Sequence, residues 1–166
     1  MSDPLGTVHR DGDRLSVRLE RRYAATVEEV WRAFTDPESI RRWLFADAVL
    51  EPRLGGAFGL SWSAEHRVSG ELRAWEPPHL LEVTWVEAGG DSVVHVEISA
   101  DGDGALLVLE HRDVSSAETA GGLGAGWHAH LAALDDLLAG SDAISDRWRP
   151  RFDELHPRYR ELVEAT

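Results

Sequence analysis

Apolar and polar residues alternate over residues 14–23, with leucine or valine at every second position from 15 to 19. This period of two predicts a strand with one buried face. The apolar spacing then becomes helical, and Thr26, with Glu29 three positions later, forms the pattern of a capping box. Asp36-Pro37 ends this helix and begins a second short one. The apolar positions of the two helices are Val27, Val30, Trp31, Phe34, Ile40, Trp43 and Leu44.

From Asp47 onward, short alternating runs are separated by turn residues, beginning with Gly55-Gly56 and Pro77-Pro78. This pattern predicts an antiparallel meander in which each strand buries one face. The residues predicted to face inward are Phe58, Leu60, Trp62, Leu81, Val83, Trp85, Val94, Val96, Ile98, Leu107, Leu109 and His111. The residues predicted to face outward are Glu82, Thr84, His95, Glu97 and Glu110.

Helical periodicity returns over residues 115–140, where a narrow apolar stripe includes Trp127 and Leu131. Four glycines, at positions 121, 122, 124 and 126, interrupt its first half. Each glycine costs about 1 kcal/mol relative to alanine inside a helix. We therefore expect the helix to begin near Gly126, after a loop or a frayed turn, and to end at Gly140.

The last residues form an extension in which large apolar side chains keep a spacing of four and three residues. These side chains are Trp148, Phe152, Leu155, Tyr159 and Leu162. Pro157 is expected to kink or divide any helix there, because proline cannot donate the helical hydrogen bond. The sequence thus predicts a domain of residues 14–140 and a helical extension of residues 141–166.

Composition limits the chemistry and the compartment. The 166 residues fit one domain, and the absence of cysteine excludes disulfides and thiolate metal sites. The first residues lack the basic and apolar regions of a leader peptide, and no apolar run approaches the roughly 18 residues of a membrane helix. We therefore expect a cytoplasmic protein. Its net charge of −13 disfavours nucleic acid and anionic membranes as partners.

Short motifs along the chain follow the order of a known family. They are ATVEEVWRAFTDP at residues 25–37, Trp43, Gly55-Gly56-Ala57-Phe58, Gly70-Glu71-Leu72, Pro77-Pro78, Leu81, Thr84-Trp85, Gly104, Leu107, Leu109, His111 and Gly126-Trp127. With them, the chain resembles the START-like (SRPBCC, helix-grip) superfamily. Within it, the chain resembles the family named for the activator of the ninety-kilodalton heat-shock protein ATPase. The resemblance spans residues 16–140.

The resemblance implies an α+β helix-grip fold, in which a curved antiparallel sheet wraps around a long C-terminal helix and two short helices follow the first strand. It is specific for fold and not for function. One alternative that it implies is a cochaperone-like or regulatory protein that contacts a chaperone. The chain departs from the family at Ala74, where many relatives carry an acidic residue, and in the extension.

The apolar inward faces predict a cavity between the sheet and the last helix, because ligand sites are mostly apolar clefts with a few polar groups. We expect it to bind a hydrophobic or aromatic small molecule. The residues expected to line it are Phe58, Leu60, Trp62, Val83, Trp85, Val96, Leu109, His111, Trp127, His130 and Leu131. The alternative is that the tryptophans fill this space as core. The sequence leaves both open.

His111 is the strongest polar candidate, because it shares a strand face with Leu107 and Leu109 and is directed toward Trp127. His130 lies about 60° from Trp127 on the helical wheel and is expected to flank the cavity. A polyketide cyclase-like or hydrolase-like enzyme would use His111 as its acid or base. The alternative is a core histidine satisfied by a backbone carbonyl. Binding is favoured over catalysis, because the acidic strand residues fall on the outer face.

Neither a metal site nor a cofactor is expected. His128 and His130 are two residues apart, so their side chains diverge on a helix. The glycines of residues 122–126 lack the lysine and the preceding strand of a phosphate-binding loop.

Several apolar residues interrupt the polar outer face that is predicted for the sheet. They are Trp75, Val86, Val93, Leu106 and Val108. Such a patch is normally covered, here either by the extension or by a second copy of the chain. We predict a homodimer in which the extension takes part, because its apolar stripe is too long to be satisfied by its own turns.

Overall fold

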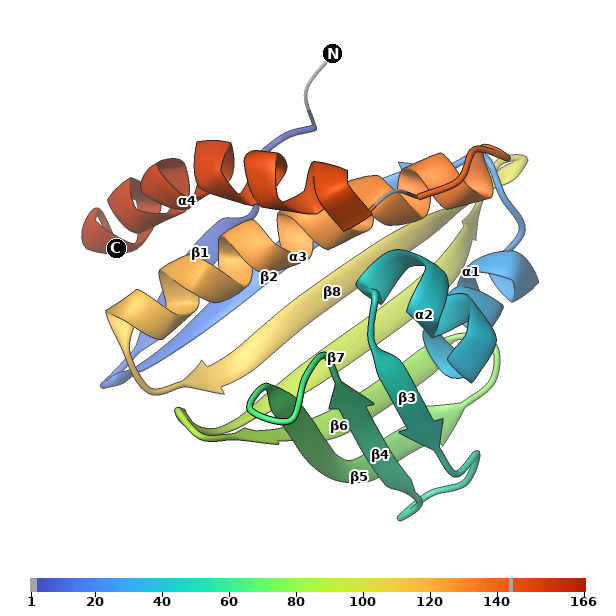
Figure 1. Cartoon of the computed structure of the whole chain (residues 1–166), viewed down its shortest axis with the longest axis horizontal. Coiled ribbons are helices and arrows are strands. Elements are labelled where there is room, and N and C mark those ends of the chain that lie inside the picture. The colour runs from blue at the N-terminus through green and yellow to red at the C-terminus, as the bar shows by residue number, and fades with distance from the viewer. Residues whose placement is uncertain (1–2, 144) are drawn as a thin grey trace.

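An eight-stranded antiparallel sheet wraps around helix α3 (Ala117–Leu138) in the computed structural model of the chain (Figure 1). The structure describes residues 3–143 and 145–166. Met1 and Ser2, which belong to the segment compared with a leader peptide, lie outside these ranges, as does Ile144 of the extension. The strand order is β1-β2-β8-β7-β6-β5-β4-β3. The strands are β1 (Thr7–Asp11), β2 (Arg14–Tyr23), β3 (Asp47–Leu50), β4 (Ala57–Ser61), β5 (Arg67–Glu76), β6 (Leu80–Glu87), β7 (Gly90–Asp101) and β8 (Gly104–Val114).

Two short helices follow β2, namely α1 (Val27–Thr35) and α2 (Pro37–Leu44). The capping box of α1 is present, since Thr26 Oγ1 accepts from the Glu29 amide and the Glu29 carboxylate accepts from the Thr26 amide. Asp36 caps α2 in the same way by accepting from the Ser39 amide. The predicted α+β helix-grip fold is confirmed. The sequence missed β1, because most of its side chains are exposed and leave no apolar alternation.

Helix α3 begins at Ala117, so the prediction of a loop before Gly126 is wrong. Ser116 caps the helix, and the glycines lie within its first half. Gly121 and Gly124 face the extension, where a Cβ on Gly124 would lie 2.5 Å from the Tyr159 ring. The conformational cost of these glycines is offset by the close helix packing that only glycine allows.

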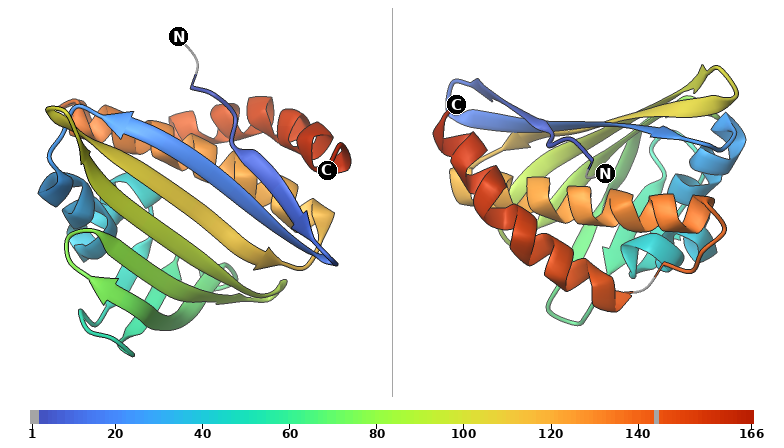
Figure 2. Two further views of the ribbon diagram at one scale, coloured as in Figure 1. Left: turned by 180° about the vertical axis from the view of Figure 1, so that it is seen from behind. Right: turned by 90° about the horizontal axis from the view of Figure 1, so that it is seen from above.

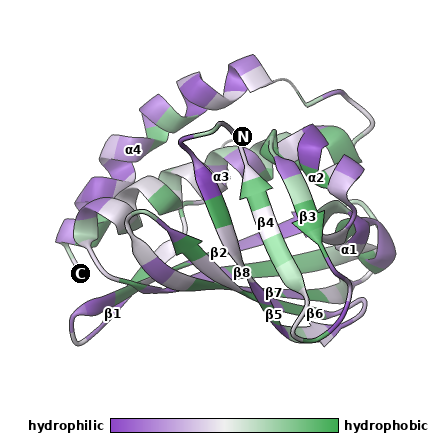
Figure 3. Ribbon diagram, turned by 60° about the horizontal axis from the view of Figure 1, so that its bottom comes forward, coloured by the Kyte–Doolittle hydropathy of each residue, from purple (hydrophilic) through white to green (hydrophobic). Residues whose placement is uncertain are grey.

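The extension forms a 3-10 turn, η1 (Ser145–Arg147), and helix α4 (Trp148–Glu164), which packs on α3 and reaches β1 (Figure 2). The helix is not divided at Pro157. Leu155, Tyr159 and Val163 are buried and belong to the same hydrophobic core as the sheet. The Tyr159 hydroxyl accepts from the Gly6 amide at 2.8 Å and bonds His128 Nδ1 at 2.8 Å. Leu155 and Tyr159 of the apolar stripe are therefore covered within the chain, whereas Trp148, Phe152 and Leu162 are partly buried. The remaining surface of α4 is largely hydrophilic (Figure 3).

The outer face of the sheet is more polar than the sequence predicted. A register shift between Leu72 and Ala74 breaks the alternation of β5. Trp75 therefore pairs with the inward residue Leu81 and packs 5.1 Å from Trp31, so its assignment to the outer face is wrong. Ala74 takes the outer position instead, away from the interior.

Charged side chains surround the apolar residues that remain on this face. Glu82 contacts His95 at 2.9 Å and Arg112 at 3.4 Å, and Arg112 also pairs with Glu110. Only Val86 of the predicted patch is exposed, at 38%, and Val93 is buried. The homodimer stays a prediction. The two features that suggested it, the apolar residues on the outer face of the sheet and the apolar stripe of the extension, are largely covered by other parts of the same chain. Within the described ranges, no helix is long and apolar enough to cross a membrane.

Candidate functional site

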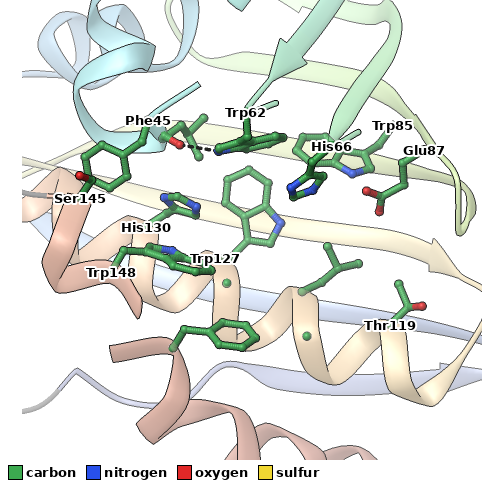
Figure 4. A pocket seen from close by; sticks show the side chains of 15 residues that line it. Phe45, Trp62, His66, Trp85, Glu87, Thr119, Trp127, His130, Ser145 and Trp148 are labelled. Carbon is green, nitrogen blue, oxygen red and sulfur yellow. Dashed lines mark hydrogen bonds between the residues drawn. The ribbon is translucent and has the colours of Figure 1, made fainter. Parts of the chain in front are cut away.

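A cavity of about 560 Å³ opens between the sheet, helix α3 and the start of the extension (Figure 4). Its walls come from the C-terminal end of α2, the loop after strand β4, the end of β6, helix α3, the turn η1 and the first turns of α4. The lining residues are Leu44, Phe45, Trp62, His66, Trp85, Glu87, Thr119, Gly122, Leu123, Gly126, Trp127, His130, Ser145, Trp148 and Phe152. A volume of this size falls in the range of small-molecule sites.

Aromatic rings form most of the wall, and packing between them fixes their orientation. Trp62 donates its indole N–H to the Leu44 carbonyl at 2.8 Å and stacks on His66 with ring centres 4.7 Å apart. On the side of the extension, Trp148 stacks on Phe152 at 5.0 Å. These rings present flat apolar surfaces toward a shared space (Figure 4), an arrangement that suits a flat apolar ligand.

His111 lies in the core behind this wall, fully buried, with both ring nitrogens engaged. Nδ1 accepts from Trp127 Nε1 at 3.0 Å, so Nε2 carries the proton and donates to Ser92 Oγ at 2.7 Å. Trp85 packs edge-on against the imidazole at 5.3 Å. Burial lowers the pKa of His111 to about 3. The predicted inward orientation toward Trp127 is confirmed, but its partners are two side chains rather than a backbone carbonyl.

His130 lines the cavity itself. Its Nδ1 lies 3.0 Å from the Trp43 carbonyl, which can only accept, so Nδ1 carries the proton and Nε2 holds a lone pair. The ring lies 5.1 Å from Trp148 and 5.9 Å from Phe45, between the extension and the end of α2. Burial lowers the pKa of His130 to about 4, so the imidazole is neutral at physiological pH.

The glycines of α3 divide between two faces of the helix. Gly121 and Gly124 face α4, whereas Gly122 and Gly126 line the cavity. A Cβ built on either of the latter meets no atom within 4 Å. The absence of side chains at these two positions therefore creates part of the cavity volume.

Deeper between sheet and helix, the space is almost filled. A void of only about 30 Å³ remains there, room for about one water molecule, and its walls include Phe58, Leu60, Val83 and Val96. The sequence left open whether the space between sheet and helix is a cavity or is filled by core side chains, and each alternative holds for a different part of that space. The deep space is packed core, and the open cavity lies at its mouth.

The structure brings together four of the residues that were expected to bind ligand, namely Trp62, Trp85, Trp127 and His130. Leu109, His111 and Leu131 line neither the cavity nor the deep void. Sequence reasoning missed the residues that reach the cavity from loops, from the end of β6 and from the extension, chiefly Phe45, His66, Glu87, Trp148 and Phe152. The apolar stripe of the extension was a usable signal, but its spacing does not reveal where the helix docks.

These features define a helix-grip protein of the START-like kind with an aromatic cavity at the mouth of its core. The chain belongs to the Activator of Hsp90 ATPase homolog 1-like family, whose model matches residues 24–139. A search of curated proteins finds no match.

Solved structures support the same assignment. The chain is 32% identical to CalU16 from Micromonospora echinospora, with a TM-score of 0.77 and 96% of each chain covered. It is 27% identical to the protein encoded by gene BPP1335 from Bordetella parapertussis, with a TM-score of 0.72, covering 97% of this chain and 95% of that one. An Hsp90 activator from Plasmodium falciparum, PFC0360w, is 26% identical over 60% of this chain and 73% of its own, with a TM-score of 0.52.

Proposed function

We propose that the protein binds a flat, largely apolar small molecule in the cavity between α3, the sheet and the start of α4. The observation that carries this proposal is a space of about 560 Å³ whose walls include six aromatic side chains, from Phe45, Trp62, Trp85, Trp127, Trp148 and Phe152. Aromatic walls left open to water cost free energy, and a ligand that covers them recovers it at about 25 cal/mol per Å² of apolar surface.

Catalysis by His111 receives no support from the geometry. Both of its nitrogens are hydrogen-bonded, and its ring lies behind Trp85 and Trp127 rather than on the cavity wall. A general base needs a free lone pair within reach of a substrate proton. Contact with a chaperone remains a prediction from the family resemblance, and the chemistry of the cavity neither favours nor opposes it.

Filling the cavity from Gly126 tests the proposal. A Gly126→Leu side chain would enter the open space and displace ligand from about 60 Å² of wall, which costs about 1.5 kcal/mol. We expect the affinity for a flat aromatic probe such as 2-naphthol to fall at least about tenfold, measured by titration calorimetry.

Gly126→Ala is the matched control, because a single methyl group leaves most of the volume open. Its affinity should stay within about threefold of wild type. Equal binding by wild type and Gly126→Leu would refute the cavity as the binding site, and failure of wild type to bind any flat aromatic probe would refute the proposed function.

A further inference from the structure

Two indole N–H groups at the cavity have no hydrogen-bond partner among the described residues. They belong to Trp85, on β6, and Trp148, at the start of α4, and both nitrogens are buried. Buried tryptophan N–H groups normally find an acceptor, as Trp43, Trp62 and Trp127 do in this chain. Both nitrogens are closed to solvent in this conformation, so an acceptor from outside the chain would pair with them once the indole edges turn toward the cavity.

Next to Trp148 lies His130, whose ring is the one imidazole among the described wall residues that is bonded to a backbone carbonyl. Because His130 Nδ1 donates to the Trp43 carbonyl, Nε2 presents an acceptor. The rings of His130 and Trp148 are 5.1 Å apart and tilted by 36°, and the Trp148 nitrogen lies on the ring edge nearer His130 (Figure 4). A donor and an acceptor on adjacent rings match a hydroxyl group, which can accept one hydrogen bond and donate another.

The charges around the cavity disfavour an anion. None of the described residues that line it is an arginine, and the chain has no lysine. The lining includes the carboxylate of Glu87, which lies two positions after Trp85 on β6 and so faces the same way. Burial keeps His130 neutral, with its pKa lowered to about 4. A ligand carboxylate or phosphate would lose its hydration here without gaining a cation.

We propose that the ligand is an uncharged, flat aromatic alcohol whose hydroxyl group accepts from Trp148 Nε1 and donates to His130 Nε2. A further oxygen on a longer ligand accepts from Trp85 Nε1. This inference rests on the proposed function, because it specifies which aromatic molecules the same cavity selects.

A series of naphthalenes that differ at one position tests the inference by calorimetry at pH 7.5, where phenols remain uncharged. We expect 2-naphthol to bind about tenfold more tightly than 2-methylnaphthalene, which has neither donor nor acceptor. The affinity of 2-methoxynaphthalene, which can accept but not donate, should lie between them. The anion 2-naphthoate should bind at least about tenfold more weakly than 2-naphthol.

Two substitutions locate the effect. Trp148→Phe keeps a ring but removes the donor, so the preference for 2-naphthol over 2-methylnaphthalene should fall by about fivefold. Trp31→Phe is the matched control, because Trp31 packs on Trp75 and does not line the cavity, and the preference should stay unchanged. His130→Asn retains a donor for the Trp43 carbonyl and should lower the preference by removing the ring acceptor.

The outcomes separate this inference from the proposed function. Equal affinities for 2-naphthol and 2-methylnaphthalene would overturn the hydroxyl assignment while leaving a cavity that binds aromatics. Tighter binding of 2-naphthoate than of 2-naphthol would overturn the argument from charge. A Trp148→Phe variant that weakens both neutral probes equally would show a packing role for the ring and would also overturn the inference.

Discussion

Lowering the pH from 7.5 to 5 is expected to remove about 4 kcal/mol from the free energy of unfolding through His111 and His130 alone. Burial lowers the pKa of His111 to about 3 and that of His130 to about 4. In the unfolded chain both titrate near 6.5. Above pH 6.5 both states are neutral and the histidines contribute nothing. Below it the unfolded state takes up protons that the folded state cannot, so stability falls until the pH reaches the folded pKa values.

His128 acts in the same direction, because burial, together with the Arg21 charge, lowers its pKa to about 4. Urea unfolding monitored by tryptophan fluorescence between pH 7.5 and 5 measures the effect. In a His111→Gln variant, the free energy of unfolding should depend less steeply on pH, by about 1.4 kcal/mol per pH unit. This difference should appear whatever the stability of the variant at neutral pH. Stability that stays constant down to pH 5 would contradict the burial of neutral histidines.

Gly124→Ala is expected to destabilise the protein by about 2 kcal/mol, although alanine is the better helix former. The added Cβ would lie 2.5 Å from Tyr159 Cδ1. The ring cannot withdraw freely, because its hydroxyl is bonded to the Gly6 amide and to His128. Overpacking of this kind costs about 3 kcal/mol, and the gain in helix propensity offsets about 1 kcal/mol of it.

The same substitution two residues later should have the opposite sign. Gly126→Ala meets no atom within 4 Å, so only the helix propensity acts and stability should rise by about 1 kcal/mol. For a chain of this size, the melting temperature of Gly124→Ala should lie about 4 to 8 °C below that of wild type, and that of Gly126→Ala about 2 to 4 °C above it. Stabilisation by both substitutions would show that α4 does not pack on α3 as described.

The sequence was sufficient to predict those features that depend on residues close together in the chain, such as helix caps and the alternation of strands. The capping box at Thr26 and Glu29 and the alternation of β8 were read directly, and His111 faces Trp127 as expected. Trp75 was misassigned because one register shift in β5 reverses every following side chain, and nothing in the composition of that strand marks the shift.

The start of α3 and the position of the cavity depend on contacts between distant segments. The glycines at positions 121 and 124 looked like helix breakers, because their compensating neighbours, Tyr159 and Arg160, come from α4. Alternation also correctly identified inward residues such as Phe58 and Val96, but it could not show that packing nearly closes the space between them. The cavity depends on where Trp148 and Phe152 dock, which periodicity alone does not specify.

The indole signals in a nitrogen-15 NMR spectrum test the aromatic cavity most directly, because the chain has seven tryptophans, each with one indole N–H. During a titration with 2-naphthol, we expect saturable shifts of the signals from the four tryptophans of the wall, Trp62, Trp85, Trp127 and Trp148. The signals of Trp31 and Trp75, which pack on each other and do not line the cavity, should remain in place. Saturable shifts at Trp31 and Trp75, with the four wall signals unmoved, would contradict a ligand site in this cavity.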